Sequence, residues 1–302
     1  MGSDFDVFLD AAWDDHGDDP QGVLDRLPAG LPLATTGVQF LGWVGLTAHV
    51  TGHHLGRWDE GIALLDGVAE APQLAAEQVR AVRRSQALLR LASGDRAAAD
   101  ALLAANPDAA RPPASALVRV LIGAASALVG QRQTERATTL MDEALAAADY
   151  GPAGDDPAAR ALAASCNNIA MELEEVPDRD LEDTALMLRA ARQARTWWEV
   201  AGTPTNVMLA EVRVAASLLA AGQSDAALVR AHTAASLSEA PETLAGHRLQ
   251  ALLVLGNAQL AAGALAAARA GLAEVQAVLD RVPPEYQGIY GPQVDALSAS
   301  VS

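Results

Sequence analysis

Residues 249–280, LQALLVLGNAQLAAGALAAARAGLAEVQAVLD, constrain the fold more than any other stretch of this sequence. They read as two helices joined at Gly263, each with apolar side chains recurring on one side. Gly256 and Ala268 are small where two helix backbones would approach closely. The large side chains that would fill the remaining gaps are Leu252, Leu255 and Leu272. The stretch therefore predicts an antiparallel helix pair.

The same pattern recurs upstream, with a glycine at each predicted turn. Gly56, Gly94 and Gly130 are separated by 38 and 36 residues, and Gly222 and Gly263 by 41. Hydrophobic residues make up 51% of the chain and are mostly Ala and Leu, while aromatic residues make up 4%, which favours helices over strands. No stretch alternates convincingly between apolar and polar residues, so we expect an all-α chain of about 13–15 helices.

The recurring pattern also predicts a division of the chain. We expect an N-terminal helical cap at 1–33, an array of about six helix pairs at 34–282, and a C-terminal capping helix at 283–302. Pro28, Gly30 and Pro32 are expected to end the second helix of the cap, and GPAGDDP at 151–157 is predicted to be a flexible joint. The predicted pairs are 34–72, 74–105, 114–149, 158–201, 205–240 and 249–280.

Two segments, 55–72 and 222–279, resemble the tetratricopeptide repeat, and the weaker resemblance extends over about 35–280. The stretch around Asn167 is similar to the longer units, of about 40 residues, in bacterial regulators and kinesin light chains. The family implies a right-handed α-solenoid of antiparallel pairs. The matching residues in the first segment are Gly56, Trp58, Gly61, Leu65, Val68 and Pro72, with Gly61 where the family has Ala. The family's large aromatic residue before the turn glycine is replaced by Leu218 and Gln259.

Members of this family usually bind peptides or partner helices in a concave groove lined by their first helices, without catalysis. An asparagine amide in such a groove can hold a peptide backbone, although Asn167 and Asn168 could instead satisfy each other. Arg84 and Arg213 come from distant units, so we expect no clamp for a carboxylate. The groove positions implied by the resemblance are Trp43, Thr47, Arg84, Asn167, Asn168, Met171, Arg213, Gln250 and Asn257.

The charge of the chain narrows the class of partner. Its net charge is −17 and all 21 basic residues are Arg, which argues against nucleic acids and anionic membranes as partners. The single cysteine, Cys166, excludes an internal disulfide, favours a reducing compartment and reads as an inert buried thiol. We find no signal peptide and no apolar run long and clean enough to span a bilayer, so we expect a cytoplasmic protein.

Histidine and aspartate clusters in the N-terminal third are the nearest approach to a metal or catalytic site. His49 and His53 are four residues apart, as in helical metal-binding pairs, and His54 follows, but the zinc-protease motif lacks its Glu. A polar helix end explains them more simply. A solvated helix end with an N-cap likewise explains Asp14, Asp15, His16, Asp18 and Asp19. We therefore expect no metal, cofactor or catalytic residue.

Three hypotheses about function follow. The first is a binding scaffold for a protein or peptide, the second is a sensor of a small molecule or signalling peptide in the same groove, and the third is an enzyme using the N-terminal His and Asp residues. We favour the first, and the oligomeric state stays open. Trp197 and Trp198 are expected to pack in the core, with an exposed contact patch as the alternative.

Overall fold

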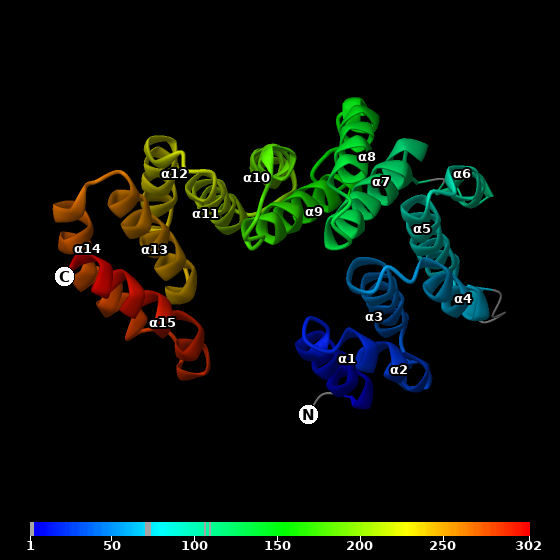
Figure 1. Ribbon diagram of the computed structural model, residues 1–302. Helices are drawn as coiled ribbons and strands as arrows, with labels where there is room; N and C mark the ends of the chain where they lie inside the picture. Colours follow the sequence, from blue (N-terminus) through cyan, green and yellow to red (C-terminus); the bar gives the residue numbers. More distant parts are fainter. Residues whose placement is uncertain (1–2, 70–73, 106, 109) are drawn as a thin grey trace. The chain divides into compact units, whose positions relative to one another are not determined.

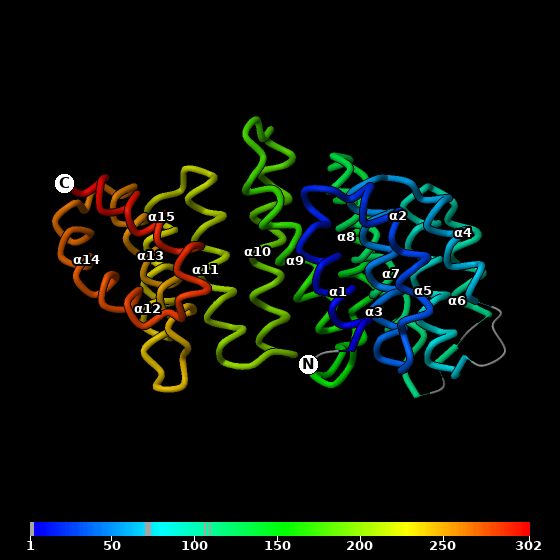
Figure 2. The backbone as a smooth tube through the Cα atoms, turned by 90° about the horizontal axis from the view of Figure 1, so that it is seen from below, coloured from blue at the N-terminus to red at the C-terminus, as the bar shows by residue number. Residues whose placement is uncertain are grey.

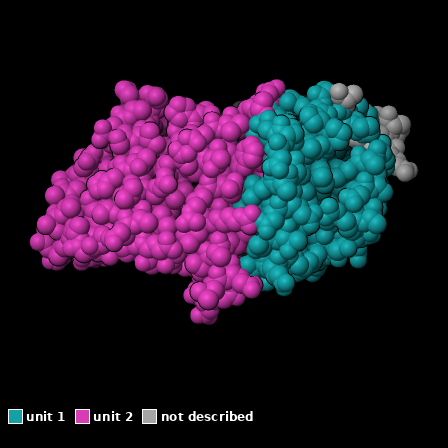
Figure 3. Space-filling view, turned by 90° about the horizontal axis from the view of Figure 1, so that it is seen from above, with its two compact units in different colours: residues 1–152, 156–161 teal, residues 153–155, 162–302 magenta. Residues whose placement is uncertain are grey.

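The computed structural model describes residues 3–69, 74–105, 107–108 and 110–302. Over these residues the chain forms fifteen α-helices and no strand (Figure 1). The prediction of an all-α chain is therefore confirmed. The chain divides into two compact units: unit 1 comprises 1–152 and 156–161, and unit 2 comprises 153–155 and 162–302 (Figure 3). The change of unit falls beside the loop predicted to be a joint.

Unit 1 is built from helices that pack mainly against their neighbours in sequence. The α-helices are α1 (Asp4–Asp15), α2 (Pro20–Gly30), α3 (Gly37–Ala48), α4 (Trp58–Ala69), α5 (Ala76–Ser93), α6 (Arg96–Ala105), α7 (Pro113–Gly130) and α8 (Thr134–Ala147). Three short segments are the 3-10 helices η1 (Leu31–Leu33) and η3 (Ala148–Tyr150) and the π-helix η2 (His49–His54). The central helix, α5, contacts α3, α4, α6 and α7. The first helices of three successive predicted pairs, α3, α5 and α7, therefore lie in a row.

Helix α9 (Pro157–Glu174) begins in unit 1 and continues into unit 2. The remaining helices of unit 2 are α10 (Leu181–Ala201), α11 (Pro204–Ala220), α12 (Ser224–Leu237), α13 (Ala245–Ala261), α14 (Leu265–Leu279) and α15 (Pro284–Val301). Helix α13 contacts α11, α12, α14 and α15 (Figure 2). Helix α15 buries Val294, Leu297 and Val301 in a cluster shared with α13 and α14.

Four of the five glycines at predicted turns have a positive φ. Gly56, Gly94, Gly222 and Gly263 have φ between 61° and 98°, a backbone conformation that favours glycine. The turn predicted near Gly130 follows it directly at 131–132: Gly130 is the last residue of α7, and Arg132 takes the positive φ of that turn. Gly130 is needed for packing instead, since a Cβ there would lie 2.4 Å from a backbone oxygen of η2.

Two further small residues accept a side chain from another helix. A Cβ on Gly256 would lie 2.7 Å from Leu297, so this glycine makes room for α15 and not for the close approach of two backbones predicted from the sequence. A Cβ on Gly61 would lie 2.2 Å from the Thr51 hydroxyl, which explains why this position is a glycine. Contacts with side chains of other helices therefore explain the glycine at both positions.

Two predicted boundaries differ in outcome. Helix α2 runs to Gly30 and contains Pro28, so it ends within the predicted group of Pro28, Gly30 and Pro32. Pro72, expected to close the first pair, lies outside the described residues.

Helix α7 concerns the expectation that no apolar run is long and clean enough to span a bilayer. Within the described residues, Pro113–Gly130 is long and apolar enough to cross a membrane by length and composition. Just over half of it is buried inside the structure, where Val118, Leu121 and Ile122 belong to the core. It therefore has the burial of a core helix.

Candidate functional site

The groove candidates Trp43 and Thr47 lie in the core of unit 1. Trp43 is 1% exposed and donates its indole N–H to the Leu27 carbonyl at 2.8 Å, and Thr47 is 0% exposed. The resemblance placed both side chains where a ligand would contact them, and their burial corrects that expectation. The physical reason is packing: Trp43 belongs to the hydrophobic core of the N-terminal helices, and the Thr47 hydroxyl donates to the Trp43 carbonyl at 2.9 Å.

Two groove candidates of unit 2 are engaged by other residues. Arg213 on α11 forms an ion pair with Glu174 on α9, and the same carboxylate accepts a hydrogen bond of 2.5 Å from Ser217. Gln250 on α13 donates to the Tyr290 hydroxyl on α15 at 2.8 Å. Both therefore connect helices within the unit.

The remaining candidates of unit 2 are more accessible. Asn168 and Asn257 are exposed, and Met171 is 41% exposed. The Asn167 amide donates to the Asn168 carbonyl oxygen at 3.4 Å, so the two asparagines do contact each other, as the alternative explanation proposed. Asn168, Met171 and Asn257 stay candidates for a binding surface.

Arg84 leads to a candidate site, a cavity of about 490 Å³ on unit 1, called the arginine cavity below. It lies among α5, α6, the α6–α7 connection and α7. Five arginines and two aspartates line it: Arg80, Arg83, Arg84, Arg111, Arg119, Asp100 and Asp108. Its apolar wall includes Leu102, Leu103, Pro107, Pro112, Pro113 and Leu117. This lining is net positive in a chain whose net charge is −17.

The arginines of α5 share one carboxylate. Glu77 accepts a hydrogen bond from Arg80 at 2.9 Å and lies 3.4 Å from Arg84. Burial raises the pKa of Glu77, but the hydrogen bonds and charges of these arginines outweigh it and leave that pKa below its ordinary value. One negative charge therefore serves two guanidinium groups.

Arg119 on α7 is the least compensated cation of the cavity. Its guanidinium forms no hydrogen bond or ion pair with any residue that the structure describes. Burial, and then the positive charge of Arg84, lowers the pKa of Arg119 to about 10, so the side chain is still protonated at neutral pH. A partly buried cation of this kind is suited to receive an anionic group.

The sequence did not lead to this cavity, because Arg84 was compared only with Arg213, as part of a clamp of basic residues and asparagines. These two arginines belong to different units, and the basic neighbours of Arg84 in the sequence are the ones that line the cavity. Arg80, Arg83 and Arg84 share one face of α5 by helical spacing, and this signal was present in the sequence. Arg119 lies near the arginines of α5 because α7 packs against α5. The sequence pattern does not predict that packing.

The histidines of the N-terminal third gather around η2. His49, His53 and His54 lie on that π-helix, and His16 follows α1. Burial, followed by the charges of neighbouring histidines, lowers the pKa of His49 to about 3 and of His54 to about 4, so both rings are neutral at pH 7. The aspartates nearby have structural contacts: Asp15 pairs with Arg26 at 2.7 Å, and Asp19 caps α2 through the Gly22 N–H.

The tryptophan pair and the cysteine were weighed for function as well. Trp197 and Trp198 are both half-buried on α10, so neither forms a fully exposed patch. Cys166 is 0% exposed on α9, and burial raises its pKa to about 12. The expectation of a buried thiol is therefore confirmed.

Comparison with known proteins adds no family. No protein-family model matches the chain, and no curated protein sequence shows significant similarity to it. Its function is therefore inferred from its own residues and geometry.

Proposed function

We propose that this chain is a non-enzymatic, tetratricopeptide-like scaffold of the cytoplasm, and that it binds an acidic segment of a partner protein in the arginine cavity. The helix pairs, the turn glycines and the row of α3, α5 and α7 support the repeat architecture. In such an array the first helices carry the binding surface, and α5 and α7 both contribute to the cavity.

The observation that carries the proposal is the unpaired Arg119 beside Arg84 and Arg80. A guanidinium group binds a carboxylate through two parallel hydrogen bonds, and it does so more strongly where water is partly excluded. An Asp or Glu side chain entering the cavity would supply the charge that Glu77 alone does not. The leucines and prolines of the wall would contact the apolar residues beside it.

Binding is favoured over catalysis by the residue types present. Among the described residues that line the cavity there is no histidine, cysteine or lysine to act as a nucleophile or base. The Ser115 hydroxyl donates to Asp156 at 2.6 Å, and the same aspartate accepts from the α9 backbone. This serine therefore belongs to a helix cap.

The proposal is tested with a short fluorescein-labelled peptide rich in Asp and Glu, beside the same peptide carrying Asn and Gln. Fluorescence anisotropy should show binding of the acidic peptide only. Arg84→Gln and Arg119→Gln should each weaken it by at least about tenfold, because a charge-assisted hydrogen bond contributes about 1.5–3 kcal/mol. Arg57→Gln is the matched control, since Arg57 lies outside the cavity and pairs with Glu60.

Equal affinity for the two peptides, or an equal loss in Arg57→Gln, would contradict the proposal. A pull-down from native lysate extends the test to the natural partner. The full chain should retain a stoichiometric protein that the Arg84→Gln, Arg119→Gln double variant loses.

A small anionic molecule is the second candidate ligand. The cavity volume of about 490 Å³ lies within the roughly 300–1,000 Å³ of small-molecule sites. If the chain is a sensor of this kind, succinate or inorganic phosphate should raise its melting temperature, and the double variant should not respond. Binding of the acidic peptide, with no rise in melting temperature on adding succinate or phosphate, would favour the protein-binding scaffold over the small-molecule sensor.

A further inference from the structure

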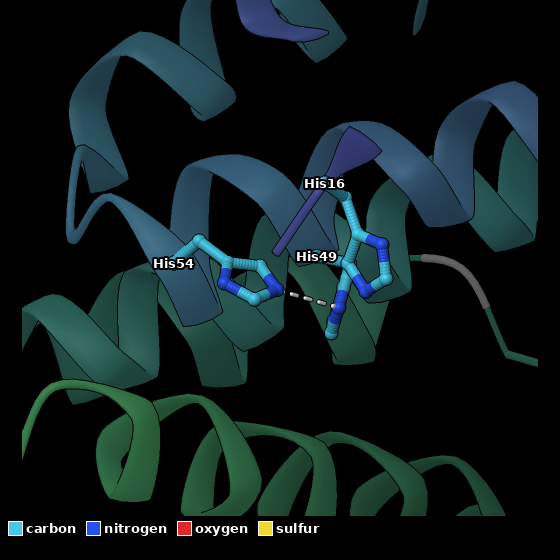
Figure 4. Close-up of side chains that lie close together, drawn as sticks. All are labelled: His16, His49 and His54. Atoms are coloured by element: carbon cyan, nitrogen blue, oxygen red, sulfur yellow. Dashed lines mark hydrogen bonds between the residues drawn. The ribbon is translucent and has the colours of Figure 1, made fainter. Parts of the chain in front are cut away.

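Three histidines from two separate segments converge in unit 1. His16 comes from the turn after α1, and His49 and His54 come from the two ends of η2 (Figure 4). One ring nitrogen from each lies within 4.8 Å of the other two. The Nε2 atoms of His49 and His54 are 3.1 Å apart. The rings therefore point toward one small volume.

The π-helix explains why the sequence pointed to a different pair. In an α-helix, residues four apart share a face, which joins His49 to His53. In η2 the hydrogen bonds span five residues, as in the Leu55 N–H bond to the Val50 carbonyl, and His54 therefore comes beside His49. The Nδ1 atom of His53 lies 3.2 Å from the Ser126 carbonyl on α7, and its backbone oxygen accepts from Gln131. His53 is thus tied to α7.

The separation of the His49 and His54 nitrogens suits a tetrahedral metal centre, and a ring nitrogen of His16 lies within 4.8 Å of both. Ligand nitrogens at 2.0–2.1 Å from zinc lie about 3.3–3.4 Å from one another, close to the separation of the two η2 histidines. The His16 Nδ1 atom is hydrogen-bonded to the Trp13 carbonyl, which directs its Nε2 atom outward as the ligand. A carbonyl on the second ring nitrogen is the usual support of a metal-binding histidine.

We propose that His16, His49 and His54 bind one divalent transition-metal ion, with zinc as the probe of choice. Neutral imidazoles are preferred ligands of zinc, nickel and copper. All three side chains are half-buried, so a fourth coordination position is open to water. The ion would fasten α1 to η2, and so attach the N-terminal helices to the first repeat-like pair. This goes beyond the proposed peptide binding and is independent of it.

A hydrogen bond between neutral imidazoles would also hold two rings 3.1 Å apart, so the experiment has to separate the two arrangements. The full chain without a tag is treated with chelator, dialysed and titrated with zinc by calorimetry. We expect one zinc per chain and a rise in melting temperature. Cobalt in place of zinc should give the visible absorption of a tetrahedral nitrogen site.

His49→Ala and His54→Ala should each weaken zinc binding by at least about tenfold, since loss of an outer-shell partner alone costs about 10–100-fold. His16→Ala tests the third ligand without altering η2. His232→Ala is the matched control, because this histidine lies exposed on α12, and it should bind zinc as the parent chain does.

The fold of each variant is checked by far-UV circular dichroism and by thermal melting without zinc, neither of which depends on peptide binding. A variant that keeps the helical signal of the parent chain and has lost zinc supports the site, and zinc binding retained by Arg119→Gln would show that the site does not depend on the arginine cavity. No zinc binding by the parent chain, or undiminished binding in all three variants, would overturn the proposal.

Discussion

Arginines are placed differently in the two units. In unit 2, Glu211 is 1% exposed and accepts a hydrogen bond from Arg195 at 2.8 Å, with Arg230 at 3.4 Å. Arg213 is likewise paired with a partly buried carboxylate. In the arginine cavity of unit 1, Arg80 and Arg84 share Glu77, and Arg119 has no partner among the described residues.

This difference distinguishes arginines that stabilise the fold from an arginine that is available to bind a ligand. A buried carboxylate surrounded by arginines depends on them, because its charge would otherwise lie unpaired away from water. An arginine without a partner adds little to the fold and keeps its hydrogen-bonding capacity for a ligand. Substitutions that remove one charge at a time test this distinction.

The largest effect is expected from Glu211→Gln. The amide cannot compensate the two guanidinium groups, so we expect a loss of about 1.5–3 kcal/mol in the free energy of unfolding. Urea denaturation followed by circular dichroism measures it. A loss below about 0.5 kcal/mol would show that the arginines of unit 2 are as independent as those of the cavity.

Arg213→Gln should cost less, about 1–2 kcal/mol, because Ser217 still donates to Glu174. Burial already raises the pKa of Glu174 above its ordinary value despite the charge of Arg213. Losing that charge should raise it further, and titration monitored by NMR would detect the change. An unchanged pKa would mean that the ion pair is weak in solution.

Arg119→Gln should change the free energy of unfolding by less than about 0.5 kcal/mol, since no hydrogen bond or ion pair with a described residue is lost. The same urea titration applies, alongside the peptide-binding assay. A large destabilisation would place Arg119 with the structural arginines of unit 2 and remove the main support for the cavity as a binding site.

Small effects on stability are also expected from Asn168→Ala and Asn257→Ala in unit 2. Both side chains are exposed, so each substitution should alter the free energy of unfolding by less than about 1 kcal/mol while weakening the binding of a protein partner. Thermal melting and partner affinity are measured together. If both variants lose several kcal/mol, these asparagines are structural and unit 2 offers no amide-lined surface.

The helices and most turns could be predicted because local signals determine them. Apolar periodicity and glycines with positive φ mark the pairs along the chain, as at Gly222 and Gly263. Contacts between distant segments could not be read in this way. Gly256 looked like a site of close backbone approach, yet the residue it accommodates, Leu297, lies on α15.

The candidate sites were harder to predict for the same reason. Trp43 has the right position on its helix for a groove, but the Leu27 carbonyl receives its N–H in the core. The meeting of His16 with His49 and His54 depends on a π-helix and on the docking of α1, and neither has a recognised local pattern. Sequence periodicity therefore predicted the helices and most turns, but not which side chains the packing of distant helices brings together.

The single buried cysteine can be used to measure how often the helices around it open. Cys166 is fully covered on α9, and its raised pKa keeps the thiol protonated, so a thiol reagent cannot modify it while the surrounding helices are closed. The rate of modification then follows the frequency with which this part of unit 2 opens, as amide hydrogen exchange does for backbone groups. Because the chain has one cysteine, the measured rate of modification reports on Cys166 alone.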